Sequence, residues 1–168
     1  MSFDLYFLSK GPDETWEDAV EALEENAADE RPLAAADLEL WRRLESKLHE
    51  VLPAAEVFEG DRNRALTDEA SGIEFSLFPG ELSLSVPYWY DGPEAERLVG
   101  VLRQIAEIVE AESGLIAFDP QADAPFLEES DGDAARTFDF IHESLANQGI
   151  KAIPSTKPKS RWRRLLGR

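Results

Sequence analysis

Cysteine is absent from this chain of 168 residues, and histidine occurs only twice. The lack of cysteine excludes a disulfide framework, thiolate catalysis, cysteine zinc sites and iron–sulfur clusters. His49 and His142 are far apart in the sequence, so no histidine zinc motif is present. No apolar run approaches the ~18 residues that span a bilayer, and the opening residues 1–4 have no basic stretch typical of a signal peptide. We therefore expect a cytoplasmic protein.

The sequence also lacks the common catalytic signatures. It contains no P-loop, no dinucleotide-binding glycine motif, no nucleophile elbow and no kinase motif. Residues 128–133 resemble a calcium loop, but Gly132 falls between Asp131 and Asp133, which breaks the EF-hand spacing. A helix-capping loop explains the same residues. We therefore expect no metal, no cofactor and a non-catalytic role rather than an enzymatic one.

Acidic residues dominate the charge. The chain holds 35 acidic and 17 basic residues, and seven of the basic ones lie in residues 151–168, where no acid occurs. The rest of the chain therefore carries a net charge of −25. Such a body repels nucleic acid and anionic lipid, which proteins bind with Lys and Arg. It attracts cations, basic proteins or its own basic segment, although solubility is an alternative reason for an acidic surface.

Apolar spacing predicts one α+β domain over residues 1–150. We expect a mixed or largely antiparallel sheet of four to six strands, with about four helices packed mainly on one face. Apolar residues that recur every second position indicate its strands, and those that recur about every 3.6 positions indicate its helices. Strands are expected at residues 3–8, near 57–58 and 64–67, in a hairpin over 73–88 and at 115–118; helices are expected at 13–28, 37–52, 93–113 and from Asp131 or Asp133 to 147.

The hairpin ends in Pro87-Tyr-Trp-Tyr90, which contains a candidate partner contact. If Leu84, Val86 and Tyr88 face the core, alternation turns Trp89 the other way. An exposed tryptophan beside acids would be an anchor for a basic partner, since Trp, Tyr and Arg dominate interface hot spots. The alternative is that Trp89 packs under the last helix or the basic segment, because large aromatics are usually mostly buried.

Two chain segments are expected to form the partner-binding patch together. Trp89, Tyr90 and Asp91 follow the hairpin, whereas Asp119 and Gln121 follow the next strand. We expect Asp119 to Gln121 to lie close to Trp89 at the end of the hairpin.

Residues 151–168 form a basic, proline-containing C-terminal tail. It mixes cations with apolar residues in a run expected to make its contacts: Arg161, Trp162, Arg163 and Arg164. The tail has three possible roles. It folds back on the acidic body, it touches an anionic membrane, where each basic residue contributes ~1 kcal/mol, or it is a disordered end. The net charge of −25 on the body opposes the membrane reading.

Recognisable runs occur at residues 3–7, 66–78, 86–89 and 114–121. They resemble the pattern TGIxxSLF, then VPYW, then YDPQ, which is shared by a family of small bacterial proteins with no established activity. The resemblance spans about residues 1–121 and implies no catalytic residues. Ser71 stands where the pattern has threonine, and Phe118 stands where it has tyrosine, which removes any role for that hydroxyl.

Three functions remain open from the sequence. The first is binding of a basic protein partner, of which neutralisation of a cationic toxin by an immunity protein would be one version. The second is a carboxylate- or metal-dependent hydrolase, which requires convergent acids in a concave site. The third is a membrane-peripheral adaptor held by the basic tail. We favour the first, because the acidic charge and the aromatic residues point to it and no catalytic motif does.

Overall fold

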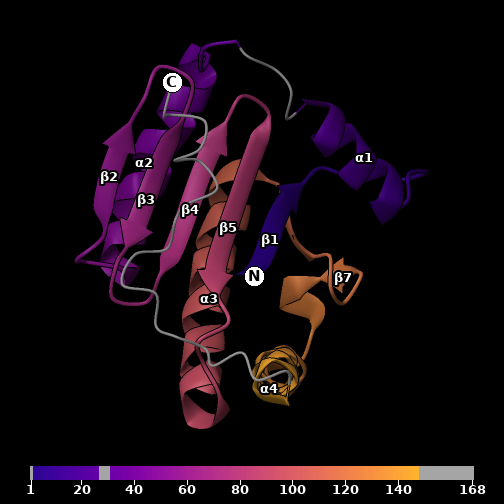
Figure 1. Cartoon of the computed structure of the whole chain (residues 1–168). Coiled ribbons are helices and arrows are strands. Elements are labelled where there is room, and N and C mark those ends of the chain that lie inside the picture. Colours follow the sequence, from indigo (N-terminus) through magenta and orange to yellow (C-terminus); the bar gives the residue numbers. More distant parts are fainter. Residues whose placement is uncertain (1, 27–30, 148–168) are drawn as a thin grey trace.

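A seven-stranded antiparallel sheet organises the molecule, and four α-helices pack against it (Figure 1). The computed structural model describes residues 2–26 and 31–147. The strands lie in the order β2-β3-β4-β5-β1-β6-β7. Their bounds are β1 Ser2–Leu8, β2 Glu56–Glu59, β3 Arg64–Asp68, β4 Ile73–Phe78, β5 Glu81–Pro87, β6 Ile116–Asp119 and β7 Ala124–Pro125. This confirms the predicted α+β class, although the sheet has seven strands rather than four to six.

The helices begin and end where local chemistry satisfies their backbone. They are α1 Trp16–Asn26, α2 Ala35–Val51, α3 Gly92–Ser113 and α4 Asp131–Asn147. Before α1, Thr15 and Asp18 cap each other's amides, with the Thr15 N–H donating to Asp18 Oδ2 at 2.8 Å. After α3, Gly114 adopts φ 73°, the left-handed conformation in which glycine ends helices.

Two helix starts differ from the sequence prediction. Helix α2 begins at Ala35 rather than Asp37, and Asp37 instead accepts the Ala34 N–H at 2.8 Å. Ser130 caps α4, because its hydroxyl accepts the Asp133 N–H and donates to Asp133 Oδ2 at 2.5 Å. In both cases an acid in the first turn reaches back toward the residue before the helix.

Alternation buries one face of the sheet. In cross-strand register, Leu66, Phe75, Leu84 and Leu5 lie side by side on the same face, and each is at most 1% exposed. Helices α2 and α3 cover this face, lying behind the sheet in Figure 1. Trp41 of α2 stacks on Phe75 with ring centroids 6.0 Å apart. The large apolar side chains of the sheet therefore face the helices.

Helix α1 covers part of the other face, whereas α2, α3 and α4 contribute to the main core, so the helices pack mainly on one face as predicted. Leu8 and Phe118 turn away from the main core and pack with Ala19 and Leu23 of α1. Trp16 stacks on Phe118 at a centroid distance of 5.0 Å. The helix thus seals a small second core over β1 and β6.

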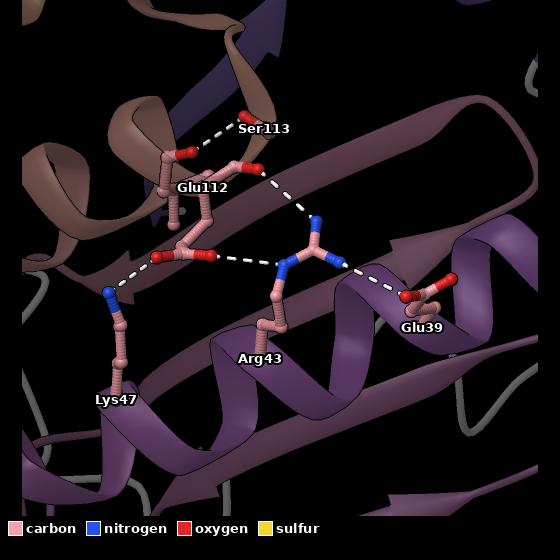
Figure 2. A network of polar contacts seen from close by, with 6 residues as sticks. Glu39, Arg43, Lys47, Glu112 and Ser113 are labelled. Carbon is pink, nitrogen blue, oxygen red and sulfur yellow. Dashed lines mark hydrogen bonds and ion pairs between the residues drawn. The ribbon is translucent and has the colours of Figure 1, made fainter.

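An ion-pair network joins α2 to α3 across their exposed sides (Figure 2). The Glu112 carboxylate of α3 accepts a hydrogen bond from Arg43 Nε of α2 at 3.1 Å. It also forms an ion pair with Lys47 of α2. Arg43 reaches Glu39 as well, at 4.0 Å. The two helices that cover the sheet are therefore linked to each other by charge as well as by apolar contact.

The chain after β6 contains structure that the sequence patterns did not predict. Strand β7 has only two residues and pairs Ala124 with Asp119, and a 3₁₀ turn follows at Phe126–Glu128. Phe126 is fully buried and its ring lies 6.0 Å from Phe3. This apolar contact packs the segment that follows β7 against the core. In the described ranges, no helix is long and apolar enough to cross a membrane.

Replacement of Phe75 by alanine should test this core. Phe75→Ala leaves a cavity between Trp41 and Phe7, so the free energy of unfolding should fall by about 3–5 kcal/mol. The matched control is Phe140→Ala, because Phe140 is 68% exposed on α4 and its loss should cost less than about 0.5 kcal/mol. Urea denaturation measures both. Equal losses would contradict the assignment of Phe75 to the core.

Candidate functional site

The face of the sheet opposite α2 and α3 carries a regular polar pattern, and we call it the outer face. No helix in the described part of the chain covers it over β2 to β5, as Figure 1 shows from the front. Its pattern consists of two adjacent rows that cross five strands. One row is Glu56, Thr67, Glu74, Ser85 and Asp4; the other is Phe58, Ala65, Ser76, Ser83 and Tyr6.

Acids alternate with hydroxyl side chains along the first row. Neighbouring strands lie about 4.8 Å apart, so Glu56, Glu74 and Asp4 follow one another at intervals of about 10 Å. This row is named the acidic row. In the second row small side chains lie between two aromatic rings, and Phe58 at the sheet edge is 45% exposed. Ser76, at the centre of the sheet, is buried.

Five basic residues of the described body pair with acids that lie outside the acidic row. Arg43 and Lys47 bind Glu112 between the helices. Three further pairs lie at strand ends or on helices: Arg64 with Glu59, Arg97 with Glu94, and Arg136 with Asp133. No Lys or Arg occurs among the residues of β1 to β5 that face outward by strand alternation. The charged side chains that face outward on these five strands are therefore all acids.

The Trp89 corner forms the margin of the outer face at the end of β5. Trp89 is half-buried, and its ring packs beside Pro87 against Gly72. A Cβ at Gly72 would lie 2.8 Å from Pro87 Cγ and 3.2 Å from Trp89 Cζ3, and Gly72 has φ 71°. Only glycine fits there without displacing the Pro87 ring and crowding Trp89.

Tyr90 and Asp91 fix the corner to neighbouring segments. The Tyr90 hydroxyl donates to the Ser71 carbonyl at 2.8 Å. Asp91 precedes α3, and its Oδ2 lies 3.3 Å from Nε2 of His142 on α4. Beside it, the Gly92 N–H donates to Asp139 Oδ1 at 2.8 Å. Tyr90 thus holds the turn before β4, whereas Asp91 stays exposed at the junction with α4.

The ends of β5 and β6 meet through Tyr88 rather than Trp89. Tyr88 is 5% exposed, and its hydroxyl donates to Gln121 Oε1 at 2.9 Å. The sequence argument placed the end of β6 near the Trp89 corner, and this bond brings Gln121 to the residue before Trp89. Gln121 is exposed, so it remains available at the surface.

Asp119 has a structural position instead of a surface one. It is 1% exposed, and its Oδ1 accepts the Gln121 N–H at 2.7 Å and the Ala122 N–H at 3.4 Å. These bonds shape the turn between β6 and β7. A carboxylate so deeply buried does not contact a partner directly. The four tail residues predicted to make contacts, Arg161 to Arg164, lie outside the described residues.

Glu129 and Asp119 are two acids whose pKa values are raised, and the charge of Asp119 acts on Glu129. Burial and then the charge of Asp119 raise the pKa of Glu129 to about 7. Burial also raises the pKa of Asp119, and burial followed by the Asp119 charge raises the pKa of Tyr88 to about 12. Asp119 Oδ2 and Glu129 Oε1 find no hydrogen-bond donor within the described residues. Two partly dehydrated carboxyls therefore compete for charge at neutral pH.

Within residues 2–26 and 31–147, no group of three or more Asp, Glu or His side chains is placed to hold a metal ion. The carboxyls whose pKa is raised are Asp119 and Glu129, and Asp119 is 1% exposed. The arrangement can present negative charge and aromatic surface on the outer face, and it can hold a proton at Glu129.

Searches against models of protein families, curated proteins and solved structures found no match for the chain. The resemblance to the bacterial family with the TGIxxSLF pattern accordingly stays a prediction.

The acidic row was missed by sequence reasoning. Alternation around Glu74 and Ser85 predicted that one face of the hairpin is wet, but it did not show which distant residues share that face. Glu56 and Asp4 join the row only through the pairing of β2 with β3 and of β1 with β5. The polar residues at alternate positions of each predicted strand were the feature of the sequence that could have indicated the acidic row.

The pKa of Glu129 should make stability depend on pH. Because this pKa is raised from its ordinary value of 4.5 to about 7 on folding, the folded state binds more protons, and stability falls as pH rises between those values. Glu129→Gln should flatten this fall between pH 5 and 8 by about 1 kcal/mol, allowing for solvent screening. Urea denaturation at several pH values measures the difference. An unchanged pH profile in the variant would show that Glu129 keeps an ordinary pKa.

Proposed function

We propose that this protein is a non-catalytic binder of a basic protein segment and that the outer face is its binding surface. The acidic row carries the proposal: three carboxylates on one sheet face, at regular intervals, with no Lys or Arg among the outward residues of the same strands. Such a surface favours cations in its neighbourhood and disfavours acidic partners.

Aromatic residues at the borders of the outer face support the same function. Phe58 is exposed at the β2 edge, and Trp89 is half-exposed at the end of β5. Aromatic side chains supply contact area and hold cations over their rings, so they complement a carboxylate row in binding Arg or Lys. Of the sequence-predicted contacts, Trp89, Asp91 and Gln121 would border the partner, whereas Tyr90 and Asp119 would position the turns.

The cytoplasm is the setting that we propose for this binding. A chain without cysteine suits a reducing compartment. Neutralisation of a cationic toxin in a bacterial cell, as by an immunity protein, would be one form of the activity. Electrostatic attraction would speed the encounter and make it sensitive to salt.

A cationic peptide tests the proposed surface. The probe is a fluorescent 12-residue peptide with arginine at every third position, followed by anisotropy at an ionic strength of about 0.01 M, where charges act over ~30 Å. Glu56→Gln combined with Glu74→Gln should weaken binding by about tenfold, since each lost pair contributes up to ~1 kcal/mol. The full-length chain is used throughout.

The control removes the same charge elsewhere. Glu50→Gln combined with Glu107→Gln neutralises two exposed carboxylates on α2 and α3 and should leave the peptide affinity nearly unchanged. If both double variants weaken binding equally, the peptide senses only net charge, and the outer face is not the binding surface.

A further inference from the structure

We propose that the basic segment of this chain, residues 151–168, binds the outer face and competes there with the basic partner. This inference rests on the proposed function, because it assigns a regulator to the same surface. The segment lies beyond α4, outside the described residues. When the segment occupies the outer face, only a partner that displaces the segment could bind there.

Charge complementarity is the first argument. The segment holds seven Lys and Arg residues and no acid, whereas the rest of the chain carries −25. The outward residues of β1 to β5 include Asp4, Glu56 and Glu74 and no base. Helices α2 and α3 also bear acids, but Arg43, Lys47 and Arg97 lie among them. The outer face is therefore the more favourable place for a cationic segment.

Spacing is the second argument. In a polyproline II conformation, which has three residues per turn, residues three apart point the same way and lie about 9 Å apart. This is close to the interval of about 10 Å between successive carboxylates of the acidic row, because they lie two strands apart. Arg161 and Arg164 have this separation in the sequence, with Trp162 between them. A segment that crossed the strands in the polyproline II conformation would place the two guanidinium groups on two consecutive carboxylates.

The position of α4 brings the segment to this surface. Asp139 and His142 bind Gly92 and Asp91, so α4 lies beside the end of β5, where the outer face ends. Its last residue is Asn147. The 14 residues from there to Arg161 span up to ~46 Å when extended. The outer face from β5 to β2 is three strand spacings wide, or about 14 Å, so the segment is long enough to cross it.

Tethering makes even a weak contact effective. A segment joined by a short flexible chain acts at an effective concentration of about 1 mM. If its dissociation constant as a separate peptide is about 0.1 mM, it would weaken binding of an external competitor by about tenfold. A partner with more cations, or better placed ones, would still displace it.

A spin label on the segment tests the contact within the full chain. Because the chain has no cysteine, Ser160→Cys creates a single labelling site. Paramagnetic broadening of backbone amide signals should be strong at Thr67 and Ser85 of the outer face and weak at Ser46 and Gln104 of α2 and α3. Glu56→Gln with Glu74→Gln should abolish the pattern, whereas Glu50→Gln with Glu107→Gln should keep it. Absent or evenly spread broadening overturns the proposal.

The cationic peptide separates this inference from the proposed function. Replacing Arg161, Arg163 and Arg164 by serine in the full chain should raise the peptide affinity about tenfold, and the Glu56→Gln and Glu74→Gln changes should cancel the gain. Peptide binding to the outer face with equal affinity in both chains overturns self-competition and supports the proposed function. Outer-face broadening with no peptide binding even in the serine variant supports segment docking, but overturns competition and the proposed function.

Discussion

The register of the antiparallel sheet determines which side chains face the helices and which face away from them. Leu66, Phe75, Leu84 and Leu5 meet in one row beneath α2 and α3 because each strand alternates its side chains. The same register places the next residues, Thr67, Glu74, Ser85 and Asp4, in one row on the opposite face. A slip by one residue would expose the apolar row and bury the carboxylates, at a large cost in free energy. Burial of the core therefore fixes the geometry of the acidic row.

Hydroxyl side chains let the sheet tolerate this accumulation of charge. Like charges directly opposite each other on neighbouring strands destabilise a sheet. Here Thr67 and Ser85 separate the acids, so successive carboxylates lie about 10 Å apart and repel by only ~0.4 kcal/mol per pair in water. The residual repulsion favours binding, since any cation between two carboxylates relieves it. A surface of this kind costs the folded chain little and still attracts a basic ligand.

Local chemistry made part of this structure predictable. The alternating residues of 73–88 predicted the hairpin of β4 and β5, and α3 ends at Ser113, as the apolar spacing predicted. What the sequence could not reveal depends on distant pairing. The burial of Asp119, the two-residue strand β7 and the meeting of Tyr88 with Gln121 all require β6 to lie beside β1, which no local pattern encodes.

The borders of the outer face determine how a ligand can lie on it. Helix α1 covers β1 and β6 through Leu8 and Phe118, and Phe58 marks the opposite edge on β2. The carboxylates follow one another across the strands rather than along any single strand. A basic chain that pairs with several of them must therefore cross the strands, with its backbone away from the ladder hydrogen bonds. Such a ligand is selected by the charge of its side chains and not by adding a strand to the sheet. A basic partner and the chain's own basic segment would therefore compete for the same row of carboxylates.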